Sequence, residues 1–154
     1  SGVVKGERLI TLCPGGNWNP KRWPKDKYAK LADMLAERFG AKIMMVGAAK
    51  DVELAEYIMS IMKHKPIITC GGTSLKELGA LLERSDLVIA NDTGPMHLAI
   101  SVKAKVMPVD KGCTAVGTTF KRFIKKSAHC QLSIVPYGRV SPRPALFFYI
   151  SSCG

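Results

Sequence analysis

Short apolar runs alternate with longer amphipathic runs over the first 110 residues, and this alternation restricts the fold more than any other feature of the sequence. The apolar runs are typical of buried strands and cover residues 9–13, 42–46, 67–69, 87–90 and 105–109. Between them, apolar residues recur at helical spacing, as Tyr28, Leu31, Leu35 and Phe39 do. Strands that alternate with helices are joined by right-handed crossovers into a parallel sheet. We therefore predict an α/β fold, a Rossmann-like parallel sheet with helices on both faces.

Three signals mark where the predicted helices begin and end. Gly40 follows the first amphipathic run, at a position where glycine commonly ends a helix. Ser74-Leu75-Lys76-Glu77 matches a capping box, in which the Ser hydroxyl and the Glu carboxylate satisfy backbone amides at a helix start. Pro95 can occupy the first position of a short helix over residues 95–102. These boundaries agree with the alternation of strands and helices.

The chain changes character after Thr114. Residues 115–154 contain six basic side chains and no acidic one, so they carry more than half of the formal net charge of +11. Pro136, Pro142 and Pro144 interrupt any regular pattern in this part. We predict a Rossmann-like domain over residues 1–114 and an irregular basic tail over residues 115–154 that contributes little to ligand binding.

Composition and cysteine spacing exclude several classes of protein. The five cysteines are an odd number without a CxxC pair, which argues against a zinc ribbon or a thioredoxin-like centre and favours free thiols in a reducing cytoplasm. No run approaches the roughly 20 apolar residues of a membrane-spanning helix, and the first residues do not resemble an export signal. We therefore expect a cytoplasmic protein with no bound metal or cofactor.

The segment Asn91-Asp92-Thr93-Gly94-Pro95-Met96-His97 follows the fourth predicted strand and opens a helix. Gly94 permits a close backbone approach, and the helix start offers unpaired amides and a positive dipole end, which together favour an anion. His97 lies in the first turn, within reach of the same ligand. Alternatively, Asp92 or Thr93 is a simple helix cap and His97 a surface histidine. The segment by itself leaves both interpretations open.

The loop between the first strand and the first helix, residues 14–24, is rich in Gly, Asn and Pro. Its two glycines permit a phosphate to approach, and Lys21 can neutralise that phosphate as a mobile point charge. The loop matches neither the dinucleotide GxGxxG pattern nor the P-loop. The alternative is a loop clamped by its two tryptophans, with Lys21 and Arg22 merely solvated.

Two more loops follow predicted strands. Asp51 follows the second strand and opens a helix, where a carboxylate is either a helix cap or an acceptor for ribose hydroxyls. Thr73 ends the Gly71-Gly72-Thr73 turn after the third strand, and this turn can border an adenine or simply lead into the capped helix. Ligands of open parallel sheets bind at the carboxyl ends of the strands, so we expect all four loops at one edge.

Taken together, "PGGNWNPKRWP", "VGAAKD" and "GGTSLKELGALLERSDLVIANDTGPMHLA" resemble the C-terminal domain of the ADP-heptose:lipopolysaccharide heptosyltransferases, glycosyltransferase family 9. The resemblance covers about residues 9–101, and Asp-(Ser/Thr)-Gly-Pro-x-His-Leu is its most specific part. Where the family usually continues with Phe-Gly-Pro-Thr, this chain has Lys111-Gly112-Cys113-Thr114. The resemblance implies one half of a GT-B fold, in which the C-terminal half binds the donor and the N-terminal half binds the acceptor.

The resemblance also implies a role for each loop. Lys21 would contact the donor phosphates, Asp51 would hold the ribose hydroxyls, and Thr73 would lie beside the adenine. The remaining substrate-binding residues would surround the diphosphate and the sugar: Asp92, Thr93, Gly94, Pro95, Met96 and His97. The family's general base belongs to the N-terminal domain, so no catalytic residue is expected here, and the isolated chain is expected to be inactive.

The leading hypothesis is therefore the donor-binding domain of an inverting glycosyltransferase, which moves heptose from ADP-heptose to the lipopolysaccharide inner core. The acceptor would bind through the other domain, and a peripheral position at an anionic inner-membrane surface is compatible with the charge. One alternative is a non-catalytic nucleotide-binding module with the same four loops. Another is a nucleic-acid or membrane binder, which the absence of basic–aromatic interleaving makes the weaker choice; we expect no nucleic-acid partner.

Overall fold

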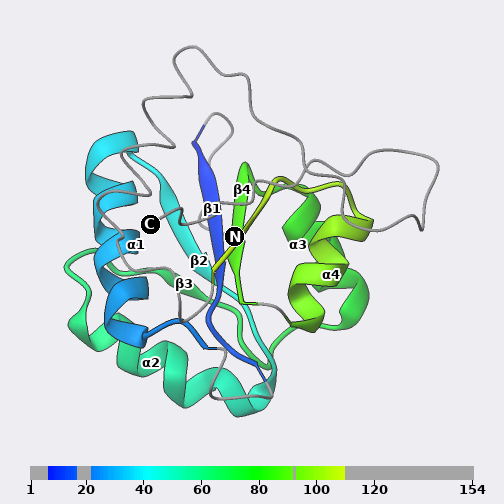
Figure 1. The fold of residues 1–154 in the computed structure, drawn as a ribbon, viewed down its shortest axis with the longest axis horizontal. Helices are drawn as coiled ribbons and strands as arrows, with labels where there is room; N and C mark the ends of the chain where they lie inside the picture. The colour runs from blue at the N-terminus through cyan, green and yellow to red at the C-terminus, as the bar shows by residue number, and fades with distance from the viewer. Residues whose placement is uncertain (1–6, 17–21, 92, 110–154) are drawn as a thin grey trace, which may run out of the picture.

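The computed structural model describes residues 7–16, 22–91 and 93–109. They form five strands: β1 (Leu9–Cys13), β2 (Lys42–Met45), β3 (Ile67–Ile68), β4 (Leu87–Ala90) and β5 (Val106–Pro108). All neighbouring strands pair in parallel, in the order β3-β2-β1-β4-β5 (Figure 1). The central strands β1 and β4 are buried at every position, as strands covered on both faces require.

Helices cover both faces of this sheet. The helices α1 (Lys25–Phe39) and α2 (Val52–Ile61) lie on one side, and α3 (Leu75–Glu83) and α4 (Gly94–Ser101) lie on the other (Figure 1). A short 3-10 turn, η2 (Ala49–Asp51), precedes α2. The predicted Rossmann-like fold is therefore confirmed. None of the described helices is long and apolar enough to cross a membrane.

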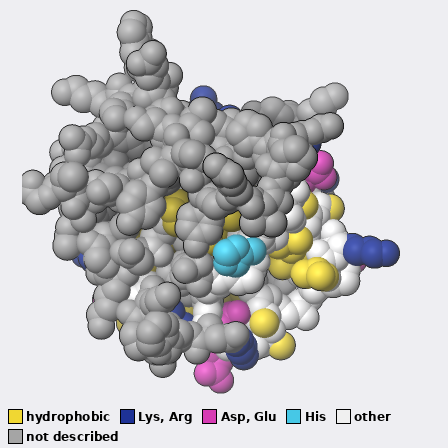
Figure 2. Space-filling model, turned by 45° about the vertical axis from the view of Figure 1, so that its right-hand side comes forward, with side chains coloured by type: hydrophobic (Ala, Val, Ile, Leu, Met, Phe, Trp, Pro, Cys, Tyr) yellow, Lys and Arg dark blue, Asp and Glu magenta, His cyan; other side chains and the backbone are white. Residues whose placement is uncertain are grey.

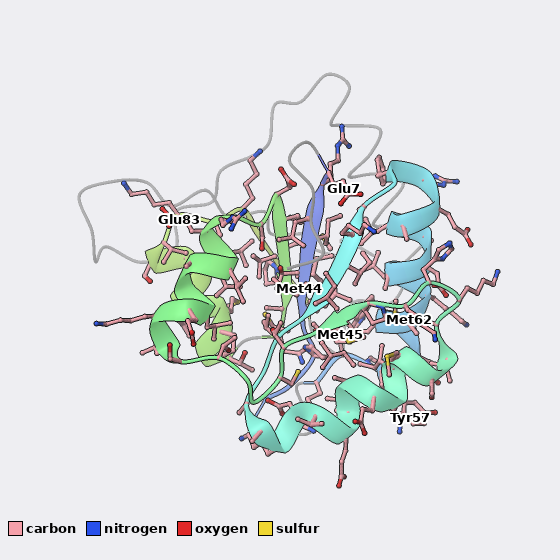
Figure 3. The ribbon with its side chains drawn as sticks, turned by 180° about the vertical axis from the view of Figure 1, so that it is seen from behind. Glu7, Met44, Met45, Tyr57, Met62 and Glu83 are labelled. Atoms are coloured by element: carbon pink, nitrogen blue, oxygen red, sulfur yellow. The ribbon has the colours of Figure 1, made fainter. Side chains whose placement is uncertain are left out.

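Each face of the sheet has its own hydrophobic core, and β2 shows the division most simply. Met45 packs with Tyr28, Leu31 and Ile58 under α1 and α2. The residue before it in the strand, Met44, packs on the side of α3 and α4 (Figure 3). Successive side chains of a strand point to opposite faces, so one short apolar strand supplies both cores.

The predicted helix ends are also confirmed. Gly40 takes the left-handed conformation at the end of α1, with φ of 59°, and its amide bonds to the Ala36 carbonyl. Ser74 and Glu77 form the capping box: the Ser74 amide donates to Glu77 Oε2 over 2.7 Å, and the Glu77 amide donates to Ser74 Oγ over 3.3 Å. Pro95 lies in the first turn of α4.

The apolar side of α2 is only partly buried. Ile58 is fully buried, but Tyr57 and Ile61 are 41% and 44% exposed. The reason is the position of α2 at the outer edge of the sheet, beside the two-residue strand β3, which offers little surface to cover. The Lys25 ammonium lies 3.6 Å from the centre of the Tyr57 ring, so a cation–π contact covers part of this face.

Candidate functional site

The strand order places a switch point between β1 and β4. From β1 the chain proceeds to β2 and β3 on one side, then returns to β4 and β5 on the other side. The loops after β1 and β4 consequently leave the sheet in different directions, and in open α/β sheets a crevice forms between such loops. Two of the four predicted ligand loops, those after β1 and β4, therefore lie at the switch point.

Asn91, the first residue after β4, joins the two loops through a buried side chain that is 1% exposed. Its Oδ1 accepts from the Trp23 amide and from the Tyr28 hydroxyl, each over 3.0 Å. Its Nδ2 donates to the carbonyls of Pro14 and Gly15 over 2.9 and 3.1 Å. All four hydrogen-bonding positions of the amide are used, so this side chain fixes the β1 loop to the end of β4.

Two glycines allow the β1 loop to pass between its neighbours. A Cβ atom at Gly15 would lie 2.5 Å from both carboxyl oxygens of Asp51, and one at Gly16 would lie 2.8 Å from the Thr93 methyl group. Arg22 bends back to donate through its guanidinium to the Gly16 carbonyl, with Nε at 2.9 Å. The loop after β1 therefore touches the loop after β2 on one side and the loop after β4 on the other.

Asp51 lies at the end of η2 and is only 6% exposed. Its Oδ2 accepts from the Ala48 amide over 2.9 Å, so the carboxylate holds its own loop against Gly15. The Asp51 charge also affects two thiols. Burial, and after it the charges of Cys70 and Asp51, raises the pKa of Cys13 far above its ordinary value. Burial, and after it the Asp51 charge, raises the pKa of Cys70 to about 11. Both thiols are free, as predicted, and the other three cysteines lie outside the described residues.

Among the described residues, no side chain caps the start of α4. Thr93 occupies the capping position, but its hydroxyl donates to the Asn91 carbonyl over 3.3 Å instead of accepting from the helix. The interpretation of the Thr93 hydroxyl as a helix cap is therefore wrong. Pro95 has no N–H, and the amides of Met96 and His97 both donate to the Thr93 carbonyl, over 3.1 and 3.3 Å.

The Gly71-Gly72-Thr73 turn joins the same edge of the sheet. Gly71 has φ of +70°, and a Cβ atom there would lie 2.9 Å from the Ala49 backbone, so both its conformation and its close approach require glycine. The Gly71 amide donates to the Gly47 carbonyl over 3.0 Å. Thr73 follows, half-buried, just before the capping box.

The structure thus brings the described parts of all four predicted loops together at the carboxyl edge of the sheet. Thr93 and Pro95 are half-buried there, and Gly94 and His97 are exposed. Met96 is 8% exposed, and its side chain packs into the core beneath α4. Figure 2 shows the side of α3 and α4, where a histidine and several hydrophobic side chains lie at the surface. Lys21, Asp92 and the tail of residues 115–154 lie outside the described residues.

Sequence reasoning missed two residues of this site, Asn91 and Arg22. Arg22 is not merely solvated, because it bonds to the Gly16 carbonyl. Asn91 carried one usable signal: an amide directly after a fully apolar strand is polar at a buried position and needs partners. Its four partners lie 63 to 77 residues away along the chain, and the sequence pattern did not identify them.

The fold and this edge define a Rossmann-like α/β domain with its loops gathered at a switch point. Residues 3–109 match the family model described as glycosyltransferase family 9 (heptosyltransferase). The chain belongs to this family.

Related proteins and structures agree with this assignment. Lipooligosaccharide heptosyltransferase 2 of Haemophilus influenzae is 39% identical over an alignment of 106 residues that covers 65% of this chain and 30% of that protein. A glycosyl transferase family 9 structure from Veillonella parvula has a TM-score of 0.66 and 34% identity, covering 70% of this chain and 31% of that one. The structure of ADP-heptose lipopolysaccharide heptosyltransferase II from E. coli has a TM-score of 0.65 and 27% identity, with coverages of 70% and 34%. The chain therefore spans about a third of the length of the relatives it matches.

Proposed function

We propose that this chain is the donor-binding part of an inverting heptosyltransferase and that ADP-heptose binds at the carboxyl edge of its sheet. One observation carries the proposal: Gly15 packs against Asp51 and Gly16 packs against Thr93, so three loops that follow different strands meet around one short glycine segment. Glycine backbone and a helix start suit a diphosphate, because glycine lets the anion approach closely and the helix start offers unpaired amides and a positive dipole end.

The diphosphate would lie between Gly16 and the start of α4. Among the described residues, the Gly94 amide has no hydrogen-bond partner, and the dipole of α4 places positive potential at the same point. His97, one turn further along the exposed side of α4, would reach the phosphate or the sugar. Lys21 and Asp92 keep the roles that the family resemblance gives them: phosphate contact for Lys21, and the surroundings of the diphosphate and sugar for Asp92.

The nucleoside would extend toward β2 and β3. Asp51 uses Oδ2 for the Ala48 amide, which leaves Oδ1 to accept from a ribose hydroxyl. The Gly71-Gly72-Thr73 turn is the next one along the sheet edge, so an adenine beyond the ribose would lie against it. This order along the edge, from α4 through β1 and β2 to β3, matches the order sugar, diphosphate, ribose and base.

In the transfer, the acceptor hydroxyl attacks the anomeric carbon of the heptose on the face opposite the diphosphate. The bond between that carbon and the β-phosphate oxygen breaks, ADP leaves with the electron pair, and the hydroxyl proton passes to a base. Backbone amides at the start of α4 would stabilise the charge that develops on the leaving phosphate. The family resemblance places the base and the acceptor on another domain, so we propose that this chain alone binds the donor without transferring the heptose.

The acceptor in this proposal is the lipopolysaccharide inner core, reached in the cytoplasm at the face of the inner membrane. The alternative of a nucleotide-binding module without transfer uses the same loops. It predicts equal affinity for ADP and ADP-heptose, because it has no need of the sugar.

Titration calorimetry of the full chain with ADP-heptose, ADP, UDP and single-stranded DNA tests the proposal. We expect ADP-heptose to bind more tightly than ADP, and both to bind more tightly than UDP or DNA. A charge-assisted contact to phosphate contributes about 1.5–3 kcal/mol, so Lys21→Ala should weaken ADP binding by roughly 10- to 150-fold. Lys30→Ala, which removes an exposed charge on α1, is the control. Tighter binding of DNA than of ADP would contradict the proposal.

A further inference from the structure

We propose that Asn91 is a positioning residue for the donor diphosphate: by holding the carbonyls of Pro14 and Gly15, it turns the amides of Gly15 and Gly16 toward the ligand. The inference rests on the proposed function and adds to it a buried side chain with no ligand contact of its own. In this role, backbone amides of the β1 loop bind the phosphates, and Asn91, at the end of β4, determines the direction in which these amides point.

The neighbours of Asn91 determine the orientation of its side-chain amide. The Trp23 backbone N–H can only donate, so the atom 3.0 Å from it must be the oxygen Oδ1. The NH₂ group then faces the two carbonyls of Pro14 and Gly15, which can only accept. An aspartate has the same shape but would place an oxygen against both carbonyls. The position therefore requires a group with acceptors on one side and donors on the other.

Peptide geometry transmits this constraint to the amides. A trans peptide is planar, and its C=O and the following N–H point in opposite directions. No described peptide bond is cis. Because the carbonyls of Pro14 and Gly15 point toward the buried Asn91, the amides of Gly15 and Gly16 point away from it.

These two amides need a partner from elsewhere. Within residues 7–16, 22–91 and 93–109, neither the Gly15 amide nor the Gly16 amide has a hydrogen-bond acceptor. On the Cα side of these residues, a Cβ atom at Gly15 would meet the Asp51 carboxyl and one at Gly16 would meet the Thr93 methyl group. Two adjacent amides that point away from Asn91 and have no acceptor in the described residues suit the oxygens of a diphosphate, and a nucleoside without phosphate would leave them unused.

The test compares ADP with adenosine on the full chain. Asn91→Ala removes both donors without adding charge, and we expect it to weaken ADP binding by about tenfold or more while adenosine binding changes by less than about threefold. Asn91→Asp should weaken ADP binding at least as much. Ser85→Ala is the matched control, because Ser85 is also buried and also joins β1 to the chain beside β4, through Thr11, but lies away from the carboxyl edge. It should leave the ratio of the two affinities unchanged.

A measurement on the unmodified chain keeps the test independent of folding defects. The amide NMR resonances of Gly15 and Gly16 should shift on addition of ADP and remain in place on addition of adenosine. If the unmodified chain does not bind ADP, the proposed function fails. If ADP binds but both glycine resonances stay unshifted, or if Asn91→Ala weakens ADP and adenosine equally, the positioning role is wrong and the proposed function stands.

Discussion

The helices α3 and α4 lie side by side on one face of the sheet, and they begin in opposite ways. At the start of α3, Ser74 and Glu77 exchange hydrogen bonds with each other's backbone amides. At the start of α4, Thr93 makes no such bond, and its hydroxyl donates to Asn91 instead. One helix satisfies its own first turn with side chains, and the other leaves an amide without a partner among the described residues.

The difference separates a helix start that its own side chains satisfy from one that leaves an amide available to a ligand. A reciprocal cap stabilises a helix but occupies the amides that an anion would use. The capped helix α3 follows the outer strand β3, whereas α4 follows β4 at the switch point. The available helix start is therefore the one at the switch point, and substitutions at the two starts should have different consequences.

The largest effect is expected where α4 meets the β1 loop. In Gly16→Ala the new methyl group would lie 2.8 Å from the Thr93 side chain, so the loop and the helix start must move apart. We expect ADP affinity to fall by roughly 10- to 100-fold, equivalent to about 1.4–2.8 kcal/mol. Titration calorimetry at constant salt measures it. An unchanged affinity would show that the diphosphate does not use this contact.

A crossed pair of hydroxyl deletions comes next. Ser74→Ala removes a helix cap and should lower the free energy of unfolding by about 1 kcal/mol, with ADP affinity within about twofold. Thr93→Ala removes no cap and should cost less stability, but it should weaken ADP binding by several-fold. Urea denaturation and calorimetry on both variants measure the two quantities. The reverse pattern would mean that α4 depends on the Thr93 hydroxyl for stability and that α3 does not depend on the Ser74 hydroxyl.

A substitution inside α3 should raise stability without affecting binding. A Cβ atom at Gly79 would make ordinary contacts, 3.8 and 3.9 Å from Val102 and Leu98. Gly79→Ala should therefore stabilise the protein by about 0.5–1 kcal/mol, because alanine is the better helix former. Thermal unfolding checks the gain, and ADP titration checks the unchanged affinity. A loss of stability would show that α3 and α4 pack too closely for a methyl group.

Local sequence signals were sufficient to predict most of the fold. The five strands lie within the predicted apolar runs, Gly40 ends α1, and the capping box begins α3. These features depend on neighbours a few residues apart, so periodicity and capping chemistry reveal them. The exposed ring of Tyr57 is the counterexample, because its burial depends on the width of the sheet beneath α2.

The site was less predictable, for a physical reason. Parallel strands place their carboxyl ends together, and this rule was enough to bring the four loops to one edge. The contacts between loops depend on register: Cys13 pairs with Ala90, and only then does Asn91 reach Pro14 and Gly15. Such a partnership, between residues about 76 positions apart, leaves no periodic trace in a single sequence.

The smallest expected effect concerns acid and the cap of α3. Hydrogen bonds from the Ser74 backbone and side chain lower the pKa of Glu77, so its carboxylate is more easily ionised in the folded chain. A lowered folded pKa gives stability that is present above the ordinary value of 4.5 and is lost as pH falls through the lowered value. In Glu77→Gln the amide oxygen accepts at every pH, so this contribution should lose its pH dependence. Urea denaturation between about pH 6 and pH 3 should show a difference in the free energy of unfolding between wild type and variant that is fully present above pH 4.5 and shrinks in acid. The difference should be small, because Glu77 is fully exposed to solvent. A constant difference across that range would show that the charge of Glu77 does not contribute to the cap, and that α3 begins on the Ser74 hydroxyl alone.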